Sequence, residues 1–170
     1  MWETFSSYQA KSNLPCLEGC GRCCLNPEVD ASTLEMFPIA LKIFDDGKLD
    51  EWLDKTESPL QDHCLFYVQE NETKGRCGIY NERPALCRMF GVAGYLTKER
   101  EVTLSICKYI SEKYPERVPL TKASDAPVFA NWTSRVSTLG TPDLNLRFPI
   151  NIALKKALHK IALYAQYQQL

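Results

Sequence analysis

The chain of 170 residues is 45% hydrophobic and 24% charged, a composition typical of a globular protein, and predicts one domain over residues 1–170. Its formal net charge is −1, and lysine and arginine form no stripe interleaved with aromatic residues, so we expect no nucleic acid among its partners. No apolar run approaches the roughly 18 residues of a membrane span, and the chain starts without a secretory signal, which predicts no membrane partner and a cytoplasmic location.

The first part of the chain predicts two helices on either side of a cysteine-rich turn. Residues 1–15 are expected to form a short lead-in helix that ends at a proline. Asp30 or Ser32 is placed to cap a longer helix with an apolar face, which runs to about Asp46. Because proline lacks an amide hydrogen, Pro38 predicts that this helix is kinked or divided in two.

The middle of the chain predicts two short helices with extended segments around them. Residues 48–57 are expected to be an acidic amphipathic helix. The extended segments 64–68 and 76–80 flank a polar turn and predict a small hairpin that brings a cysteine of each segment together. Pro84 suits the first position of a short helix that carries the next cysteine, and residues 102–106 alternate like a strand that leads to the last one.

The rest of the chain contains no cysteine and is expected to be mostly helical. Residues 113–127 contain three prolines and predict an irregular connection, and a helix is expected over 125–139. The last segment has the clearest helical period, with one apolar face at Ile150, Leu154, Leu158, Ile161 and Ala165. These elements predict a mainly α fold with a small β-hairpin, an irregular α+β class, in one compact domain stapled by cysteine-ligated metal.

The chemistry of the chain concentrates in its eight cysteines. Four of them fall within nine residues, in the pattern Cys16-x3-Cys20-x2-Cys23-Cys24, with glycines on both sides of the second. Thiolates packed this densely repel one another unless a cation neutralises them, and soft metals are the usual cation. Disulfides are the competing interpretation, but a reducing compartment and the strain of bridging sequence neighbours both disfavour them.

Several sites are compatible with this number of thiols. A structural zinc and a cubane iron–sulfur cluster each take four ligands, so the chain can supply two sites, or one site and a buried reserve. For a single cysteine such as Cys64 or Cys107, packing as a small apolar side chain is the competing interpretation. Because neighbouring side chains diverge, Cys23 and Cys24 are expected to serve different metals, or one of them to face the core. His63, next to Cys64, is a candidate ligand or a donor to a ligand, with an ordinary surface or core histidine as the favoured interpretation, and His159 is discounted.

The cysteines of the two regions, taken together, carry a family resemblance. The joint pattern is Cys16-x3-Cys20-x2-Cys23-Cys24, then Cys64, then Cys77-Gly-Ile-Tyr80-x2-Arg83-Pro84-x2-Cys87-Arg88-x-Phe90. Over roughly residues 16–107 it resembles the YkgJ-type cysteine cluster family, a zinc- or iron-chelating domain. The resemblance implies a metal-binding region over 16–107, followed by a helical C-terminal extension over 108–170. Flagellin lysine-N-methylases are similar in this domain, and in them an iron–sulfur cluster is associated with methyl transfer.

The resemblance implies that all eight thiols are candidate ligands of zinc or of an iron–sulfur cluster. They are Cys16, Cys20, Cys23, Cys24, Cys64, Cys77, Cys87 and Cys107. Tyr80, Arg83 and Arg88 are expected to support the cofactor, because a guanidinium donates hydrogen bonds to thiolates and offsets their charge. The competing interpretation is that the arginines pair with Glu82 or another nearby acid.

Three classes of function follow from these residues. The first is a metal-binding protein whose partner is the metal ion itself, with a protein partner left unidentified. The second is an iron–sulfur enzyme like the lysine-N-methylases. The third is a radical S-adenosylmethionine enzyme, suggested by the spacing of the first three cysteines, but the alternation of strands and helices that its barrel needs is missing after Cys24. The first class is the one we predict.

Overall fold

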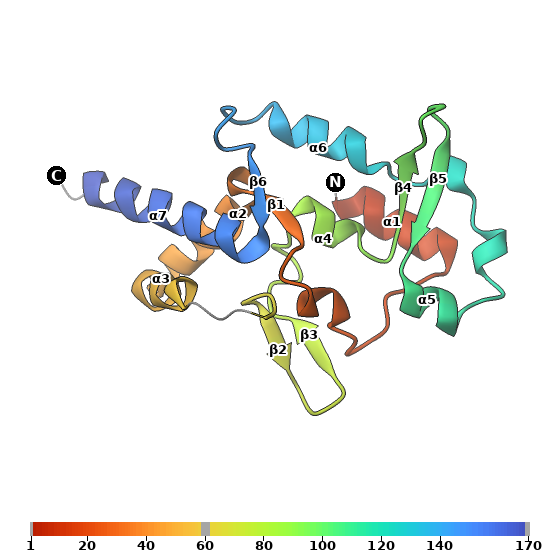
Figure 1. The fold of residues 1–170 in the computed structure, drawn as a ribbon, viewed down its shortest axis with the longest axis horizontal. Helices are drawn as coiled ribbons and strands as arrows, with labels where there is room; N and C mark the ends of the chain where they lie inside the picture. Colours follow the sequence, from red (N-terminus) through yellow and green to blue (C-terminus); the bar gives the residue numbers. More distant parts are fainter. Residues whose placement is uncertain (1, 59–61, 169–170) are drawn as a thin grey trace.

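The computed structural model describes residues 2–58 and 62–168. Figure 1 shows a helical end formed by α2, α3 and α7 and an opposite end formed by α1, β4, β5 and α5. The hairpin of β2 and β3 and the short helix α4 lie between the two ends, next to the turn that carries the first four cysteines. The predicted class, an irregular α+β fold in a single domain, is confirmed.

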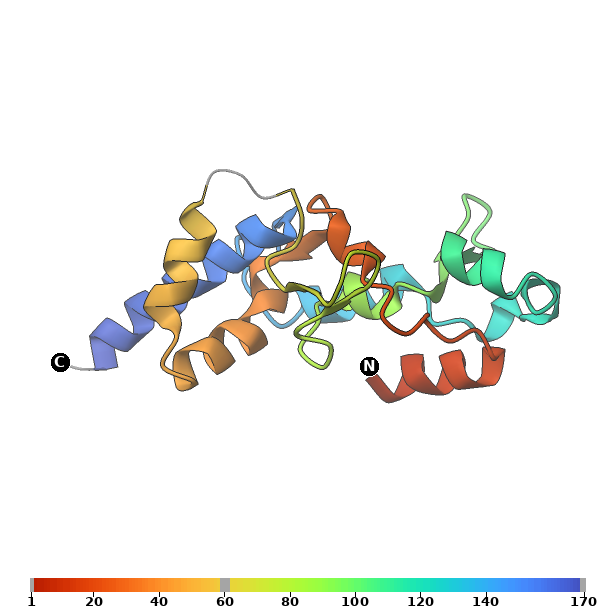
Figure 2. The same ribbon diagram turned by 90° about the horizontal axis from the view of Figure 1, so that it is seen from below.

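The helical end is organised around the last helix, α7 (Ile150–Gln168), which packs against α2 (Thr33–Asp45) and α3 (Leu49–Glu57). Its predicted apolar face is confirmed: Leu154 and Leu158 are fully inaccessible, and Ile150 and Ile161 are buried. Figure 2 shows α3 crossing this helix and α2 running beside it. The main core of the protein lies here, and it extends to the buried thiols of Cys24 and Cys64.

Helix α2 begins with a capping box. The Ser32 hydroxyl accepts a hydrogen bond from the amide of Glu35 at 3.2 Å, and the Glu35 carboxylate accepts one from the amide of Ser32 at 2.8 Å. Of the two predicted caps, Ser32 is therefore the one used. The predicted division at Pro38 is wrong, because α2 continues through the proline as one helix. The packing of its apolar face against α7 holds it together despite the missing amide hydrogen.

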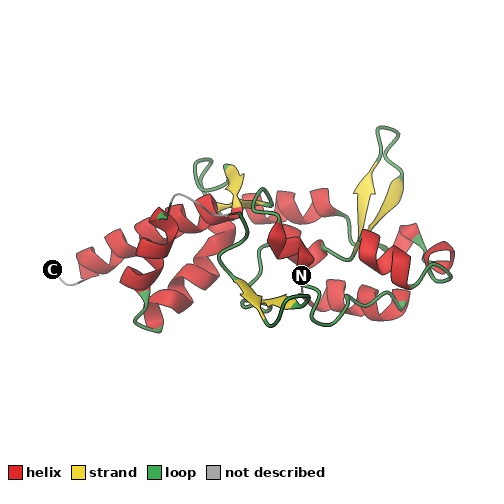
Figure 3. Ribbon diagram, turned by 60° about the horizontal axis from the view of Figure 1, so that its bottom comes forward, coloured by secondary structure: helices red, strands yellow, loops and turns green. Residues whose placement is uncertain are grey.

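Three two-stranded antiparallel sheets are present in the described residues, where one hairpin was predicted (Figure 3). The expected hairpin pairs β2 (Tyr67–Gln69) with β3 (Gly75–Cys77), so Cys64 lies in a turn before the strand and not within it. The strand expected over 102–106 is confirmed as β5 (Val102–Ile106), paired with β4 (Val92–Leu96). The third sheet joins β1 (Asp30–Ser32) to β6 (Arg147–Pro149) across most of the chain, which no local pattern signals.

The opposite end has a smaller core of its own, in which Leu14, Val92 and Ile110 are buried. Its helices and turns are α1 (Trp2–Ser12), α5 (Lys108–Lys113), η2 (Val118–Leu120), η3 (Ala123–Asp125) and α6 (Phe129–Ser137). The helix expected over 125–139 is therefore shorter than predicted, and the irregular connection before it contains two single-turn 3-10 helices. Among the described residues, no helix is long and apolar enough to cross a membrane.

Glu35 connects elements that are distant in the sequence. One carboxylate oxygen accepts from the amide of Ala85 at 3.0 Å, at the start of α4 (Ala85–Met89). The other lies 3.1 Å from the guanidinium of Arg147 in β6, and the carboxylate is only 6% exposed. Arg147 also donates to the carbonyl of Asp30 at 2.8 Å. A single buried carboxylate thus fixes α2, α4 and β6 relative to one another.

We expect Glu35→Ala to lower the free energy of unfolding by about 2–4 kcal/mol, because it removes the capping box and leaves the Ala85 amide and Arg147 without their acceptor. Denaturation in urea, read as a shift in midpoint at unchanged slope, measures this effect. Glu51→Ala is the matched control, because Glu51 lies in the first turn of α3 in an exposed pair with Lys55 and should leave the midpoint nearly unchanged. An equal shift in both variants would contradict the structural role of Glu35.

Candidate metal centre

The turn that carries the first four cysteines is shaped by two glycines. Gly19 and Gly21 both adopt positive φ, at 64° and 54°, a conformation that other residues rarely take. At Gly21 an added Cβ would also lie 2.7 Å from the backbone of Gly75, so only glycine fits against β3. The Gly75 amide donates to the Gly19 carbonyl at 3.1 Å. The hairpin is therefore docked directly on the cysteine turn.

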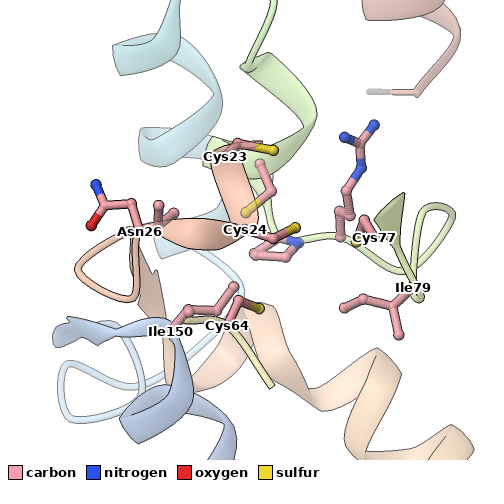
Figure 4. A pocket seen from close by; sticks show the side chains of 11 residues that line it. Cys23, Cys24, Asn26, Cys64, Cys77, Ile79 and Ile150 are labelled. Carbon is pink, nitrogen blue, oxygen red and sulfur yellow. The ribbon is translucent and has the colours of Figure 1, made fainter. Parts of the chain in front are cut away.

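Five thiols line a small enclosed pocket at the junction of η1 (Arg22–Leu25), the hairpin and α4. They belong to Cys23, Cys24, Cys64, Cys77 and Cys87. Figure 4 shows the side chains of Cys23, Cys24 and Cys64 with their sulfur atoms pointing toward the side where Cys77 lies. We call Cys24, Cys64, Cys77 and Cys87 the inner thiol group.

Three parts of the chain hold the inner thiol group together. The amide of Cys64 donates to the carbonyl of Cys24 at 2.8 Å, which fixes these two residues side by side. Cys77 lies opposite Tyr67 in the β2–β3 ladder, and Cys87 lies in α4. The predicted approach of Cys64 to Cys77 is met, because both thiols hydrogen-bond to that of Cys24.

Asn151 at the start of α7 forms hydrogen bonds with the backbone on both sides of Cys64. Its side-chain amide donates to the carbonyl of His63 at 2.9 Å, and its side-chain oxygen accepts from the amide of Leu65 at 3.0 Å. Asn151 is 7% exposed, so both hydrogen bonds are shielded from water. The helical extension therefore positions a thiol of the inner group, although it contains no cysteine itself.

The thiols that line the inner pocket differ in pKa. The Cys24 thiol donates to the sulfur of Cys23 and lowers the pKa of that neighbour to about 6. Hydrogen bonding to Cys24 likewise lowers the pKa of Cys77 to about 7 and lowers the pKa of Cys64. Burial raises the pKa of Cys87, and the neighbouring sulfurs add to the rise. The Cys24 thiol has one proton, which one of its three hydrogen-bonding neighbours at a time can accept, and the proximity of all three raises the pKa of Cys24. Several thiolates are thus available to a metal near neutral pH.

Four thiols line a second, more open hollow of about 400 Å³ on the other side of the cysteine turn. They belong to Cys16, Cys20, Cys23 and Cys107, which we call the outer thiol group. Cys107 comes from a distant part of the chain and is held at the end of β5, where its amide donates to the carbonyl of Gly91 at 2.8 Å. Residue Cys16 is exposed, yet partial burial of its thiol and repulsion from the other outer sulfurs raise its pKa.

Arg83 lies between the two thiol groups. It lines both cavities and is 9% exposed, which is low for a charged residue. Its positive charge favours the thiolate forms of Cys16, Cys23, Cys77 and Cys87. Tyr80 supports it from outside: the guanidinium carbon lies 3.6 Å from the Tyr80 ring centroid, and Nε donates to the Tyr80 carbonyl at 3.1 Å.

Arg88, which was predicted to donate hydrogen bonds to thiolates, donates to two backbone carbonyls. Its Nε donates to the carbonyl of Arg83 at 2.7 Å, and its terminal nitrogen donates to the carbonyl of Asn81. Arg88 therefore braces the backbone of the turn that presents Arg83, and burial lowers its own pKa. The competing prediction, a pair between an arginine and Glu82, has support at Arg88, because the charge of Glu82 raises the pKa of that guanidinium and opposes the effect of burial.

The two histidines lie outside both thiol groups, as predicted. His63 is adjacent in sequence to Cys64, but its ring contacts the carboxylate of Asp62. His159 on α7 lies 3.5 Å from the carboxylate of Glu57. Both imidazoles are about half exposed, so these contacts are weak surface interactions.

The donor set fits a soft metal. Both groups offer only sulfur, several pKa values are lowered, and a buried guanidinium offsets negative charge. No set of three or more cysteine, histidine, aspartate or glutamate side chains within residues 2–58 and 62–168 is already arranged to hold a metal ion. The thiols are gathered without being spaced as a coordination sphere, so a metal would draw them to bond lengths of about 2.3 Å.

Comparison with known proteins agrees with this donor set. The family model CxxCxxCC, described as "Putative zinc- or iron-chelating domain", matches residues 15–116. The chain belongs to this family. The predicted resemblance is thereby confirmed, and metal chelation through clustered cysteines is the property that the family description carries. No curated protein and no solved structure matches the chain.

The family match contains all eight cysteines and ends before the residues that brace them from the C-terminal side. Sequence reasoning missed Asn151 and Glu35, because both act on backbone groups far away in the chain. The available signals were weak: an asparagine next to the apolar face of the last helix, and a glutamate three residues after a serine cap.

We expect Asn151→Leu to weaken metal binding by about 10- to 100-fold, because the loop that presents Cys64 loses both side-chain hydrogen bonds. Competition against a chromophoric chelator measures the affinity. Asn145→Leu is the matched control, since Asn145 also donates two hydrogen bonds to backbone carbonyls, those of Ser137 and Gly140, outside the lining of either cavity. Equal weakening in both variants would show that Asn151 acts only through general stability.

Proposed function

We propose that the protein binds two metal ions through its cysteines, one in each thiol group. The observation that supports this most directly is the division of the thiols between an enclosed pocket and an open hollow, with four in the inner group and four in the outer. Four thiolates are the number that a zinc ion takes in a structural site. Cys23, which lines both cavities, belongs to the outer group by this count.

The inner site is proposed to hold a single ion, zinc or iron. Its enclosed pocket has a free volume of about 10 Å³, roughly the space of one water molecule. A cluster of several iron and sulfide atoms is larger than a single ion and would have to push the walls apart. Those walls include Val29, Ile79, Pro84 and Ile150, and two of the thiols are part of the main core. An ion enclosed in this way acts as a staple of the fold.

The outer site is proposed to be the exchangeable one. Its thiols face a hollow of about 400 Å³, which admits either a zinc ion or an iron–sulfur cluster. Cys16 is exposed, so metal can enter and leave through it. The physiological role that we propose is metal binding by a cytoplasmic protein, with the inner metal structural and the outer metal reachable from solvent. The iron–sulfur enzyme alternative stays a prediction, because neither the family match nor the described contacts identify a substrate.

Paired substitutions separate the two sites. We expect the wild-type protein, purified without oxygen, to hold two metal ions per chain by elemental analysis. Cys16→Ser with Cys107→Ser should remove about one ion and leave the fold near wild-type stability, because both residues lie at the open hollow. Cys64→Ser with Cys77→Ser should remove the other ion and destabilise the protein strongly.

Each double variant serves as the control for the other. Replacing the bound metal with cobalt reports the ligands of each site through the absorption bands of the cobalt. Loss of all metal in the outer variant would show one shared site and would contradict the proposal. A wild-type content of one ion per chain would do the same. A broad band near 400 nm together with iron and sulfide, lost in the outer variant and kept in the inner one, would place a cluster in the outer site and keep the division intact.

Removal of the inner metal should lower the melting temperature by roughly 10 °C or more, since the metal binds the folded chain and not the unfolded one. Circular dichroism before and after treatment with a strong chelator measures the change, with metal removal verified by elemental analysis. Adding zinc back should restore the original melting temperature. An unchanged melt after verified removal would show that the thiols need no metal to stay packed.

A further inference from the structure

The hollow beside the outer thiol group is larger than a metal site requires. At about 400 Å³ it is within the size range of pockets that bind small molecules. It is bounded by the cysteine turn, by Arg83 and the end of α4, and by the junction of β5 with α5, so three parts of the chain form its walls. The volume left beside four sulfur ligands is therefore available to a second occupant.

The charged residues that line this hollow all have the same sign. Arg22, Arg83 and Lys108 are cationic, and none of the described residues that line it is acidic. Arg83 is buried against the sulfurs, whereas Arg22 and Lys108 are exposed at the rim. Lys108 lies 3.7 Å from Glu112 in an exposed pair, which is too weak to fix its position.

The wall between these cations is aromatic and apolar. The guanidinium carbon of Arg22 lies 4.7 Å from the Tyr109 ring centroid, which holds the arginine against this wall. Met89, Phe90 and Ile106 complete the lining, and Phe90 is 39% exposed. A cationic rim next to an apolar wall suits a molecule that has a negative group at one end and a ring at the other.

We propose that the hollow binds a small molecule carrying an oxyanion, a carboxylate or a phosphate, attached to an aromatic or apolar group. The anion contacts Arg22 and Lys108, and the apolar part lies on Tyr109 and Phe90. This inference rests on the proposed outer metal, because a divalent ion offsets two of the four thiolate charges and the buried Arg83 offsets a third, which reduces the repulsion of an anion. The alternative is that the cations serve only to offset that thiolate charge.

The test uses two probes and their neutral analogues on the zinc-loaded protein: adenosine monophosphate against adenosine, and phenylacetate against phenylacetamide. Ligand-detected NMR titration reads the affinity. We expect at least one anion to bind about tenfold more tightly than its analogue, and which one binds distinguishes phosphate from carboxylate. The double variant Arg22→Gln with Lys108→Gln should weaken that binding by about tenfold at unchanged zinc content.

The control variant, Lys98→Gln with Lys113→Gln, removes the same charge from exposed positions that do not line the hollow, and it should bind like the wild type. Binding of neither anion above its neutral analogue overturns the inference, and so does equal weakening in both double variants. Zinc content measured on the same samples keeps the two failures apart. If the samples hold two ions per chain and bind no anion, only the proposed ligand site is rejected. If the outer ion is missing, the proposed function is rejected.

Discussion

The structure depends on a crowding of sulfur atoms that would repel one another as thiolates. The crowding is relieved by the thiol proton of Cys24, which one neighbouring sulfur at a time can accept, and by the buried charge of Arg83. Arg83 in turn depends on Tyr80, which stacks on it, and on Arg88, which braces its backbone. Tyr80 and Arg88 thus affect the sulfurs indirectly, by holding Arg83, which lines both cavities.

The cysteine turn also joins the two apolar cores of the molecule. The inner thiols pack into the core formed by α2 and α7, whereas Cys107 packs against the core at the opposite end. Figure 1 shows the turn, the docked hairpin, α4 and α6 between these ends, and α6 packs against α4 and β4. A metal in the inner thiol group would cross-link η1, the hairpin and α4 at this junction.

The enclosed inner pocket and the open outer hollow suit different tasks. Closed sulfur sites elsewhere are structural, whereas a site used for exchange or chemistry keeps a face open to solvent. Cys23 and Cys24 are adjacent in the chain, yet Cys24 is buried with the inner group while Cys23 lines both cavities. The predicted divergence of these neighbours is therefore visible in their surroundings, and it allows one short 3-10 turn to serve two sulfur environments.

Most helices, the cysteine turn and the family can be predicted from local signals, namely apolar periodicity, a capping serine, glycines and thiol spacing. Only the tertiary structure divided the thiols into two groups, since that depends on which segments meet. The pairing of β1 with β6, the contacts of Glu35 and the hydrogen bonds of Asn151 on both sides of Cys64 join residues that lie 50 or more positions apart in the chain. Such contacts are decided by how apolar faces pack, and a single sequence carries no local record of them.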